Sequence, residues 1–83
     1  MSYEVVWKED AEEELAAIWN AALDRDAVTA ATDEIDRRLK QKAASLGESR
    51  EENFRVFVLK PIGVEFQVFD TPRRALVVRV WRF

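Results

Sequence analysis

The sequence predicts a single α+β domain over residues 1–83, in which a helical hairpin packs on an antiparallel sheet. Three observations support this prediction. A chain of 83 residues is long enough for one domain and too short for two. Apolar residues recur with a helical period over residues 8–46. Three β-rich runs then follow, so the predicted order is strand, helix, helix, strand, strand, strand.

The first strand is predicted at residues 3–7, a run of β-branched and aromatic side chains. The period then changes, and residues 8–23 have the pattern of an amphipathic helix. Its first turns are acidic, which suits the positive end of the helix dipole. We expect Trp7 and Trp19 to belong to the core. The apolar stripe of this helix consists of Ala11, Leu15, Ile18, Trp19, Ala22 and Leu23.

A second helix is predicted from about Ala27 to Leu46. Asp24 or Asp26 can cap its start, and Gly47 follows its end, where a left-handed residue is expected. Because only about three residues join the two helices, they must run antiparallel and share their apolar stripes. The stripe of the second helix consists of Val28, Ala31, Ile35, Leu39, Ala43 and Leu46.

The three later strands are predicted at Phe54–Leu59, Ile62–Phe69 and Ala75–Phe83. The links between them, Lys60-Pro61 and residues 70–74, are short and each contains a proline. Connections this short join antiparallel neighbours, and proline suits them because it cannot donate a hydrogen bond to the ladder.

Alternation along these strands predicts which side chains face the helices. We place the purely apolar sets inward: Phe54, Val56 and Val58; Val64, Phe66 and Val68; Leu76, Val78 and Val80. A sheet face that mixes aromatic side chains with arginines is unusual if water is its only neighbour. We therefore interpret the opposite face as a binding surface, formed by Arg55, Phe57, Glu65, Gln67, Arg79 and Trp81.

Residue types that are absent exclude several kinds of chemistry. The chain has no cysteine and no histidine, so disulfides, Cys/His zinc sites and imidazole catalysis are excluded. Two glycines are too few for a Gly-rich phosphate loop. We therefore expect neither a metal nor a cofactor.

The apolar content of the chain bears on its location and stability. No apolar run approaches the ~20 residues that a membrane-spanning helix needs, and the N-terminus lacks the pattern of a signal peptide. These observations predict a cytoplasmic protein with no membrane partner. A domain of this size buries only roughly 60–65% of its unfolded surface. We therefore expect the isolated chain to be marginally stable, or to self-associate when its partner is absent.

Charge is distributed unevenly along a chain whose net charge is −3. Residues 1–36 contain eleven acidic and two basic side chains, for a net charge of −9. Residues 37–83 contain eleven basic and five acidic side chains, for a net charge of +6. Helix dipoles explain part of this split but not the arginines of the strands. The C-terminal half can therefore attract an anionic partner.

Four parts of the sequence, which together span nearly the whole chain, carry a family resemblance. Tyr3-Glu-Val-Val-Trp7, followed by Ala11 and Leu15-Ala-Ala-Ile-Trp19, resembles the first strand and helix of the RelE/ParE superfamily. This superfamily comprises toxins of bacterial type II toxin–antitoxin modules. Leu46-Gly-Glu-Ser-Arg50 is similar to the family's helix-to-sheet turn. Pro61–Val68 and Val77–Trp81 are similar to its closing hairpin.

This resemblance implies a curved sheet with the helical hairpin across one face, and a cognate antitoxin as partner. It also implies growth inhibition by one of two routes. Some members cleave messenger RNA inside the ribosome, whereas others inhibit DNA gyrase without obvious catalytic residues. The target implied here is therefore either the ribosome with its messenger RNA or DNA gyrase.

The residues present disfavour the nuclease route. Nuclease members commonly have an Arg at the opening of the middle strand and a His or Tyr near the C-terminus, where this chain has Ile62-Gly63 and Trp81-Arg82-Phe83. RNA cleavage needs a base, an acid and a cation. Glu51, Glu52 or Glu65 can supply a base, but no good acid is evident. We predict direct binding to a target without enzymatic activity. The alternatives are a ribosome-dependent endoribonuclease and an inactive relative that serves as a protein-binding module.

The candidate site residues follow from the predicted outer face and the ends of its strands. If the protein is a nuclease, the candidate catalytic residues are Arg79, Arg82 and Arg55. For Arg50 and Arg55, pairing with nearby glutamates is the alternative, and for Trp81 it is covering the sheet edge. Arg73 and Arg74 are expected in a solvated turn. The candidate contacts with the target or antitoxin are Arg50, Arg55, Phe57, Arg79, Trp81 and Arg82.

Overall fold

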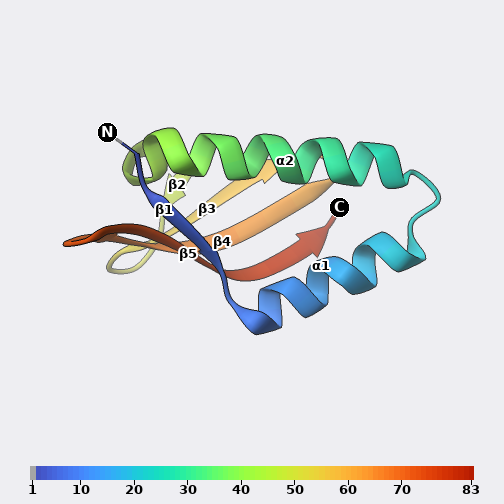
Figure 1. Cartoon of the computed structure of the whole chain (residues 1–83), viewed down its shortest axis with the longest axis horizontal. Coiled ribbons are helices and arrows are strands. Elements are labelled where there is room, and N and C mark those ends of the chain that lie inside the picture. The colour runs from blue at the N-terminus through green and yellow to red at the C-terminus, as the bar shows by residue number, and fades with distance from the viewer. Residues whose placement is uncertain (1) are drawn as a thin grey trace.

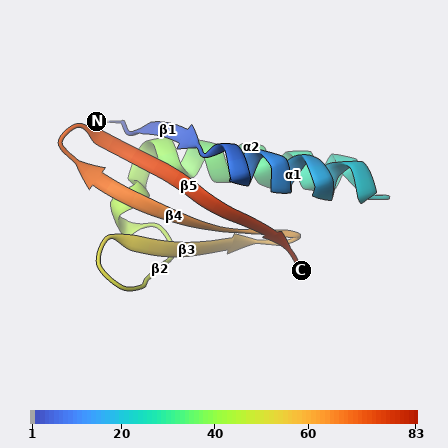
Figure 2. The same ribbon diagram turned by 90° about the horizontal axis from the view of Figure 1, so that it is seen from below.

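The computed structural model describes residues 2–83 and confirms the α+β fold class (Figure 1). A helical hairpin lies on one side of a sheet, as Figures 1 and 2 show from two directions. The elements in chain order are β1 (Glu4–Trp7), α1 (Glu9–Ala21), α2 (Arg25–Lys42), the 3-10 turn η1 (Ala43–Ser45), β2 (Glu48–Ser49), β3 (Phe54–Leu59), β4 (Ile62–Asp70) and β5 (Arg73–Arg82).

The sheet has five strands in the order β1-β5-β4-β3-β2. The strands from β2 to β5 are antiparallel to their neighbours, whereas β1 runs parallel to β5. The sheet is therefore mixed, and it contains a two-residue strand, β2, that the sequence did not indicate. Strand β1 can be parallel to β5 because the helices and three strands between them give the chain the long crossover that parallel neighbours need.

Helix α2 provides most of the helical contribution to the core. Its buried side chains are Val28, Ala31, Ile35 and Leu39, which are the residues that the helical period predicts. The helix ends at Lys42 and η1 continues the chain toward Gly47, which has the expected left-handed backbone with a φ of 70°. A Cβ atom at Gly47 would lie 2.1 Å from the carbonyl oxygen of Val56, so the turn also needs glycine for space.

Helix α1 is much more exposed than its apolar stripe predicts. Within the helix only Ala11 is buried, although Leu15 and Ile18 pack partly against the core. Trp19 is 43% exposed, and Leu23, in the connection to α2, is fully exposed. The expectation that Trp19 is a core residue was therefore wrong. The C-terminal half of α1 extends past the end of the sheet, so the sheet does not cover the stripe there (Figure 2).

The core lies between α2 and the inner face of the sheet, with β4 at its centre. Ile62, Val64 and Phe66 of β4 are fully buried. Val64 and Phe66 belong to the inward set predicted for this strand, and its third member, Val68, is half-buried against the core. The other large side chains that are fully buried are Val77 of β5 and Ile35, Leu39 and Val28 of α2. Burying each side chain of this size contributes about 1.5–3 kcal/mol to stability. The middle strand is thus the element around which both layers pack.

A β-bulge divides β5 into two parts with opposite phase. Glu65 is paired with Arg79, but its neighbour Phe66 is paired with Val77, which leaves Val78 as the extra residue. After the bulge, Val80 is buried and Arg79 and Trp81 lie on the outer face, as predicted. Before it, the prediction was wrong: Val77 is buried, whereas Leu76 is only half-buried.

The predicted face assignment of β3 was wrong along the whole strand. Phe57 is paired with Val64 and Leu59 with Ile62, and both β3 side chains pack against the core. Val58 is instead 49% exposed. Alternation failed because both faces of this strand are apolar except at Arg55, so the pattern contains no polar contrast.

Arg73 and Arg74 lie in β5 and not in the turn where they were expected. Arg74 forms an ion pair with Glu4 of β1 at 2.9 Å, and the Arg73 guanidinium lies 5.2 Å from the centre of the Tyr3 ring. Among residues 2–83, no helix combines the length and the apolar character needed to cross a membrane.

Candidate binding surfaces

The outer face of the sheet is not covered by either helix (Figure 2). Trp81 lies on this face, near the C-terminal end of β5. Trp81 is paired with Gly63 on β4, and a Cβ atom at Gly63 would lie 2.4 Å from the indole ring. The indole therefore lies against the backbone of Gly63 on the outer face. The alternative expected for Trp81, that it covers the edge of the sheet, is not what the structure has. Gly63 lies at the strand opening where the family resemblance implies a common Arg in nuclease members, and its lack of a side chain makes room for this ring.

Arg79 is the most available cation of the outer face. Its side chain is 67% exposed and lies beside Trp81, with the guanidinium carbon 5.9 Å from the ring centre. Its nearest carboxylate is Glu65, at an N···O distance of 3.8 Å, which is a loose ion pair. A cation held loosely and next to an aromatic ring can exchange its partner at little cost. Arg79 is therefore well placed to contact an anionic group on another molecule.

Arg50 lies at the margin of the same face. It donates to Glu48 at 2.7 Å, so the expected alternative of pairing with a nearby glutamate is observed. A shallow hollow of about 720 Å³ is lined by Arg50, Glu51, Phe54 and Glu65. Arg50 therefore lines the same hollow as Glu65, the carboxylate that forms the loose ion pair with Arg79.

Two of the predicted outer-face residues, Arg55 and Phe57, lie on the inner face. The Arg55 guanidinium donates to the carbonyl oxygens of Leu46 at 2.8 Å and Gly47 at 3.1 Å. Phe57 packs against the core, and the guanidinium of Arg38 from α2 lies 5.6 Å from its ring centre. Arg55 therefore holds the turn that leads from the helices into the sheet, and it does not share a surface with Arg79.

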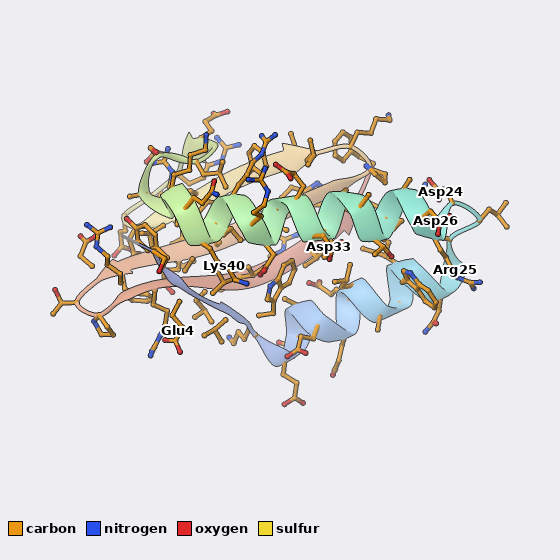
Figure 3. The ribbon with its side chains drawn as sticks, turned by 45° about the horizontal axis from the view of Figure 1, so that its top comes forward. Glu4, Asp24, Arg25, Asp26, Asp33 and Lys40 are labelled. Carbon is orange, nitrogen blue, oxygen red and sulfur yellow. The ribbon has the colours of Figure 1, made fainter. Side chains whose placement is uncertain are left out.

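Arg82 is also directed away from the outer face. It forms a 2.8 Å ion pair with Asp24 at the start of α2, which joins the end of the chain to the connection between the helices. A hydrogen bond from Arg82 holds the pKa of the Asp24 carboxyl below its ordinary value. Asp24 does not cap α2 with its side chain. Figure 3 shows Asp24 at this end of the hairpin, next to Arg25 and Asp26.

A second surface, which the sequence did not indicate, is a groove between α1, α2 and β1. We call it the helix groove. Its volume is about 770 Å³, and the apolar residues that line it include Val5, Val6, Leu15, Ala16 and Val28. The exposed side of the α1 stripe is therefore one wall of a cavity. The remaining lining residues are Trp7, Glu12, Trp19, Asn20, Thr29, Thr32, Asp33 and Asp36.

Two indole groups connect the walls of the helix groove. Trp7 of β1 donates through Nε1 to Asp36 of α2 at 3.1 Å. Trp19 of α1 donates through Nε1 to Thr29 of α2 at 3.1 Å, and Arg25 lies over its ring at 4.7 Å. The sequence held one signal for this groove. The α1 stripe has more apolar residues than a short helix can bury against the sheet.

Comparisons with known proteins place the fold. No family model matches the sequence, and no curated protein matches it. Solved structures do match over nearly the full length. A chain of the RelBE2 toxin–antitoxin complex from Mycobacterium tuberculosis matches with a TM-score of 0.80 and 15% identity, covering 100% of this chain and 93% of that one. This chain has the RelE/ParE toxin fold.

Two further structures match the chain over nearly its full length. A chain of the chromosomal ParDE toxin–antitoxin system from P. aeruginosa matches with a TM-score of 0.73 and 20% identity, covering 96% of this chain and 95% of that one. A conserved hypothetical protein from Helicobacter pylori matches with a TM-score of 0.61 and 14% identity, covering 96% and 93%. The fold that the sequence resemblance implied is therefore confirmed.

Proposed function

We propose that this protein is the toxin of a type II toxin–antitoxin module, acts by binding a cellular target directly, and is neutralised by a cognate antitoxin. The observation that carries the proposal is the RelE/ParE fold, which the chain shares over nearly its full length with structures of the ParDE and RelBE2 toxin–antitoxin systems. The uncovered outer face, with Trp81 and Arg79, is the surface that we assign to the target.

The residues of the outer face favour binding over RNA cleavage. The chain has no histidine, and its one phenol, Tyr3, is 7% exposed in the core. Arg79 and Glu65 remain as a cation and a carboxylate on this face. An arginine is a poor proton donor, because its guanidinium stays charged at all relevant pH values. A nuclease would therefore lack the acid that releases the 5′-oxygen.

The test is expression of the wild-type protein and of Arg79→Ala in a bacterial host, with primer extension on translating messenger RNA. We expect the wild type to arrest growth without codon-positioned cuts in the message. Arg79→Ala should arrest growth more weakly, because it removes the exposed cation of the proposed target surface.

Two results would contradict this proposal in different ways. Prompt cuts at codon positions that disappear in Arg79→Ala would replace direct binding with ribosome-dependent endonuclease activity. Continued growth at high expression would show that the protein is not a toxin, and would favour an inactive relative that binds proteins.

A further inference from the structure

The outer face of the sheet, which neither helix covers, carries a regular set of side chains (Figure 2). We propose that this face pairs with the same face of a second copy of the chain, so that the free protein forms a weak dimer with two-fold symmetry. In this dimer the surface assigned to the target is masked. The masking rests on the proposed function, whereas the dimer itself does not.

The pairing of β3, β4 and β5 places the outer-face side chains in three rows across the strands. Residues that pair in an antiparallel ladder project from the same face of a sheet, and the next pair projects from the opposite face. The bulge at Val78 changes the phase of β5 and so decides which of its residues belong to these rows. The rows are Val58-Gly63-Trp81, Val56-Glu65-Arg79 and Phe54-Gln67-Leu76.

Most side chains in these rows are apolar. Val58 is 49% exposed, and Trp81 and Leu76 are half-buried although no helix lies over them. The inner face of the same strands already packs on the helices, so this sheet is apolar on both faces. An apolar sheet face is stabilised by a second layer, and another sheet packed face to face is a common one. The outer face therefore has the composition of one half of a sheet-on-sheet interface.

The central row favours a second copy as the other half, because its charges are complementary to themselves. Glu65 on β4 and Arg79 on β5 are paired neighbours, with an N···O distance of 3.8 Å. A two-fold axis that runs along the strands between β4 and β5 places Arg79 of each copy over Glu65 of the other. A second copy thus satisfies both charges, whereas a partner with charge of one sign satisfies only one of them.

The same axis brings the two Trp81 indoles together. Each indole lies over Gly63 of its own chain, so no side chain at that position separates the two rings. Contacts between aromatic rings contribute more than their buried area alone. The dimer therefore has an apolar centre next to two charge pairs, which is the arrangement of a specific interface.

The size of the rows indicates that the dimer is weak. Stable interfaces bury about 800 Å² per partner. Strands about 4.8 Å apart, with rows about 6.8 Å apart along them, form a smaller patch when only three of each take part. We expect a Kd of roughly tens of micromolar. A target that binds the monomer more tightly than this displaces the second copy by mass action.

The experiment is sedimentation equilibrium of the purified chain from about 5 to about 500 µM, at about 50 and about 500 mM salt. The wild type should form a dimer that weakens as salt rises. Arg79→Glu and Glu65→Arg each place like charges opposite one another, and each should raise the Kd at least ~tenfold. Trp81→Ala tests the apolar centre without a change of charge, and it should raise the Kd by at least ~tenfold as well.

Lys42→Glu is the matched control for the change of charge. Lys42 is exposed at the end of α2, on the other side of the sheet from the proposed interface. This variant should dimerise as the wild type does. Circular dichroism checks that every variant is folded.

The most specific measurement mixes Arg79→Glu with Glu65→Arg. In the mixed pair each substituted side chain faces an opposite charge of the other chain, so the mixture should form a 1:1 dimer at least as tight as that of the wild type. Both variants keep a net negative charge, because the wild type has a net charge of −3 and each substitution changes it by two. Attraction between the whole molecules therefore does not account for this pairing.

The outcomes separate the dimer from the proposed function. A wild type that stays monomeric over the whole range overturns the dimer, and so does a dimer that Arg79→Glu, Glu65→Arg and Trp81→Ala leave unchanged. Folded Arg79→Glu and Glu65→Arg chains that do not associate when mixed also overturn it. All of these results leave the toxin–antitoxin function standing. Failure of the wild type to arrest growth contradicts that function, and it leaves the dimer standing.

Discussion

The two faces of the sheet differ in how far packing against the helices explains their side chains. On the inner face, packing explains nearly every side chain: Phe57 and Leu59 join the core, and even Arg55 is used to hold the turn at Gly47. On the outer face, no helix covers Trp81 or Arg79, and Val58 is half exposed. The outer-face residues are therefore the ones that no helix covers, and binding is a physical reason for placing an aromatic side chain beside a loosely paired cation there.

The two surfaces also differ in charge. The helix groove presents Glu12 and Asp33 without a cation in its lining, whereas the outer face presents Arg79 with a loosely held Glu65. Like charges facing each other across an interface are costly, and opposite charges favour association. The two surfaces therefore favour partners of opposite charge.

The largest expected effect tests the division between the faces at two adjacent residues of β3. Phe57→Ala should lower the free energy of unfolding by about 3 kcal/mol, because it leaves a cavity beneath α2. Val58→Ala should change it by about 0.5 kcal/mol, because Val58 lies on the exposed side. Urea denaturation measures both. A larger loss for Val58→Ala than for Phe57→Ala would show that the strand faces the other way.

A smaller effect is expected for the two arginines that the sequence placed together. Arg55→Ala should cost about 1–2 kcal/mol, because it removes two hydrogen bonds to the Leu46 and Gly47 carbonyl oxygens. Arg79→Ala should change stability by less than about 0.5 kcal/mol, because its side chain is exposed. If thermal denaturation gave equal losses for the two variants, Arg55 would have no special role in the turn.

The smallest effect concerns a charge cluster on α2 that lies outside both surfaces. Hydrogen bonds from Arg37 and Arg38 lower the pKa of Glu34 from 4.5 to about 2. A carboxyl whose pKa is lower in the folded state contributes stability above its unfolded pKa and loses it as the pH falls. Between pH 4.5 and about 2, the stability of the wild type should therefore fall more steeply than that of Glu34→Gln. The midpoint of urea denaturation, measured at several pH values, checks this. If the midpoints of the two proteins fell equally with pH, the ion pairs of Glu34 would not contribute to stability.

The sequence predicted the order of the elements except for the short strand β2, and it predicted the core of α2 and β4 because polar and apolar residues alternate there with clear contrast. It could not predict the faces of β3, where neighbours on both sides are apolar, or the phase of β5, where the bulge at Val78 shifts the alternation. Arg79 and Trp81 were placed correctly because they follow the bulge. The helix groove was missed because a periodic stripe on α1 does not reveal how much of it the sheet covers.

The central claim is that the protein is a toxin whose outer sheet face contacts the target, and growth assays test it most directly. Wild type and Trp81→Ala are expressed in a bacterial host with and without the adjacent gene, and circular dichroism checks that the variant folds. We expect the wild type to arrest growth and the adjacent gene to restore it. Trp81→Ala should not arrest growth. Arrest by Trp81→Ala as strong as that by the wild type would contradict the assignment of the target to the outer face.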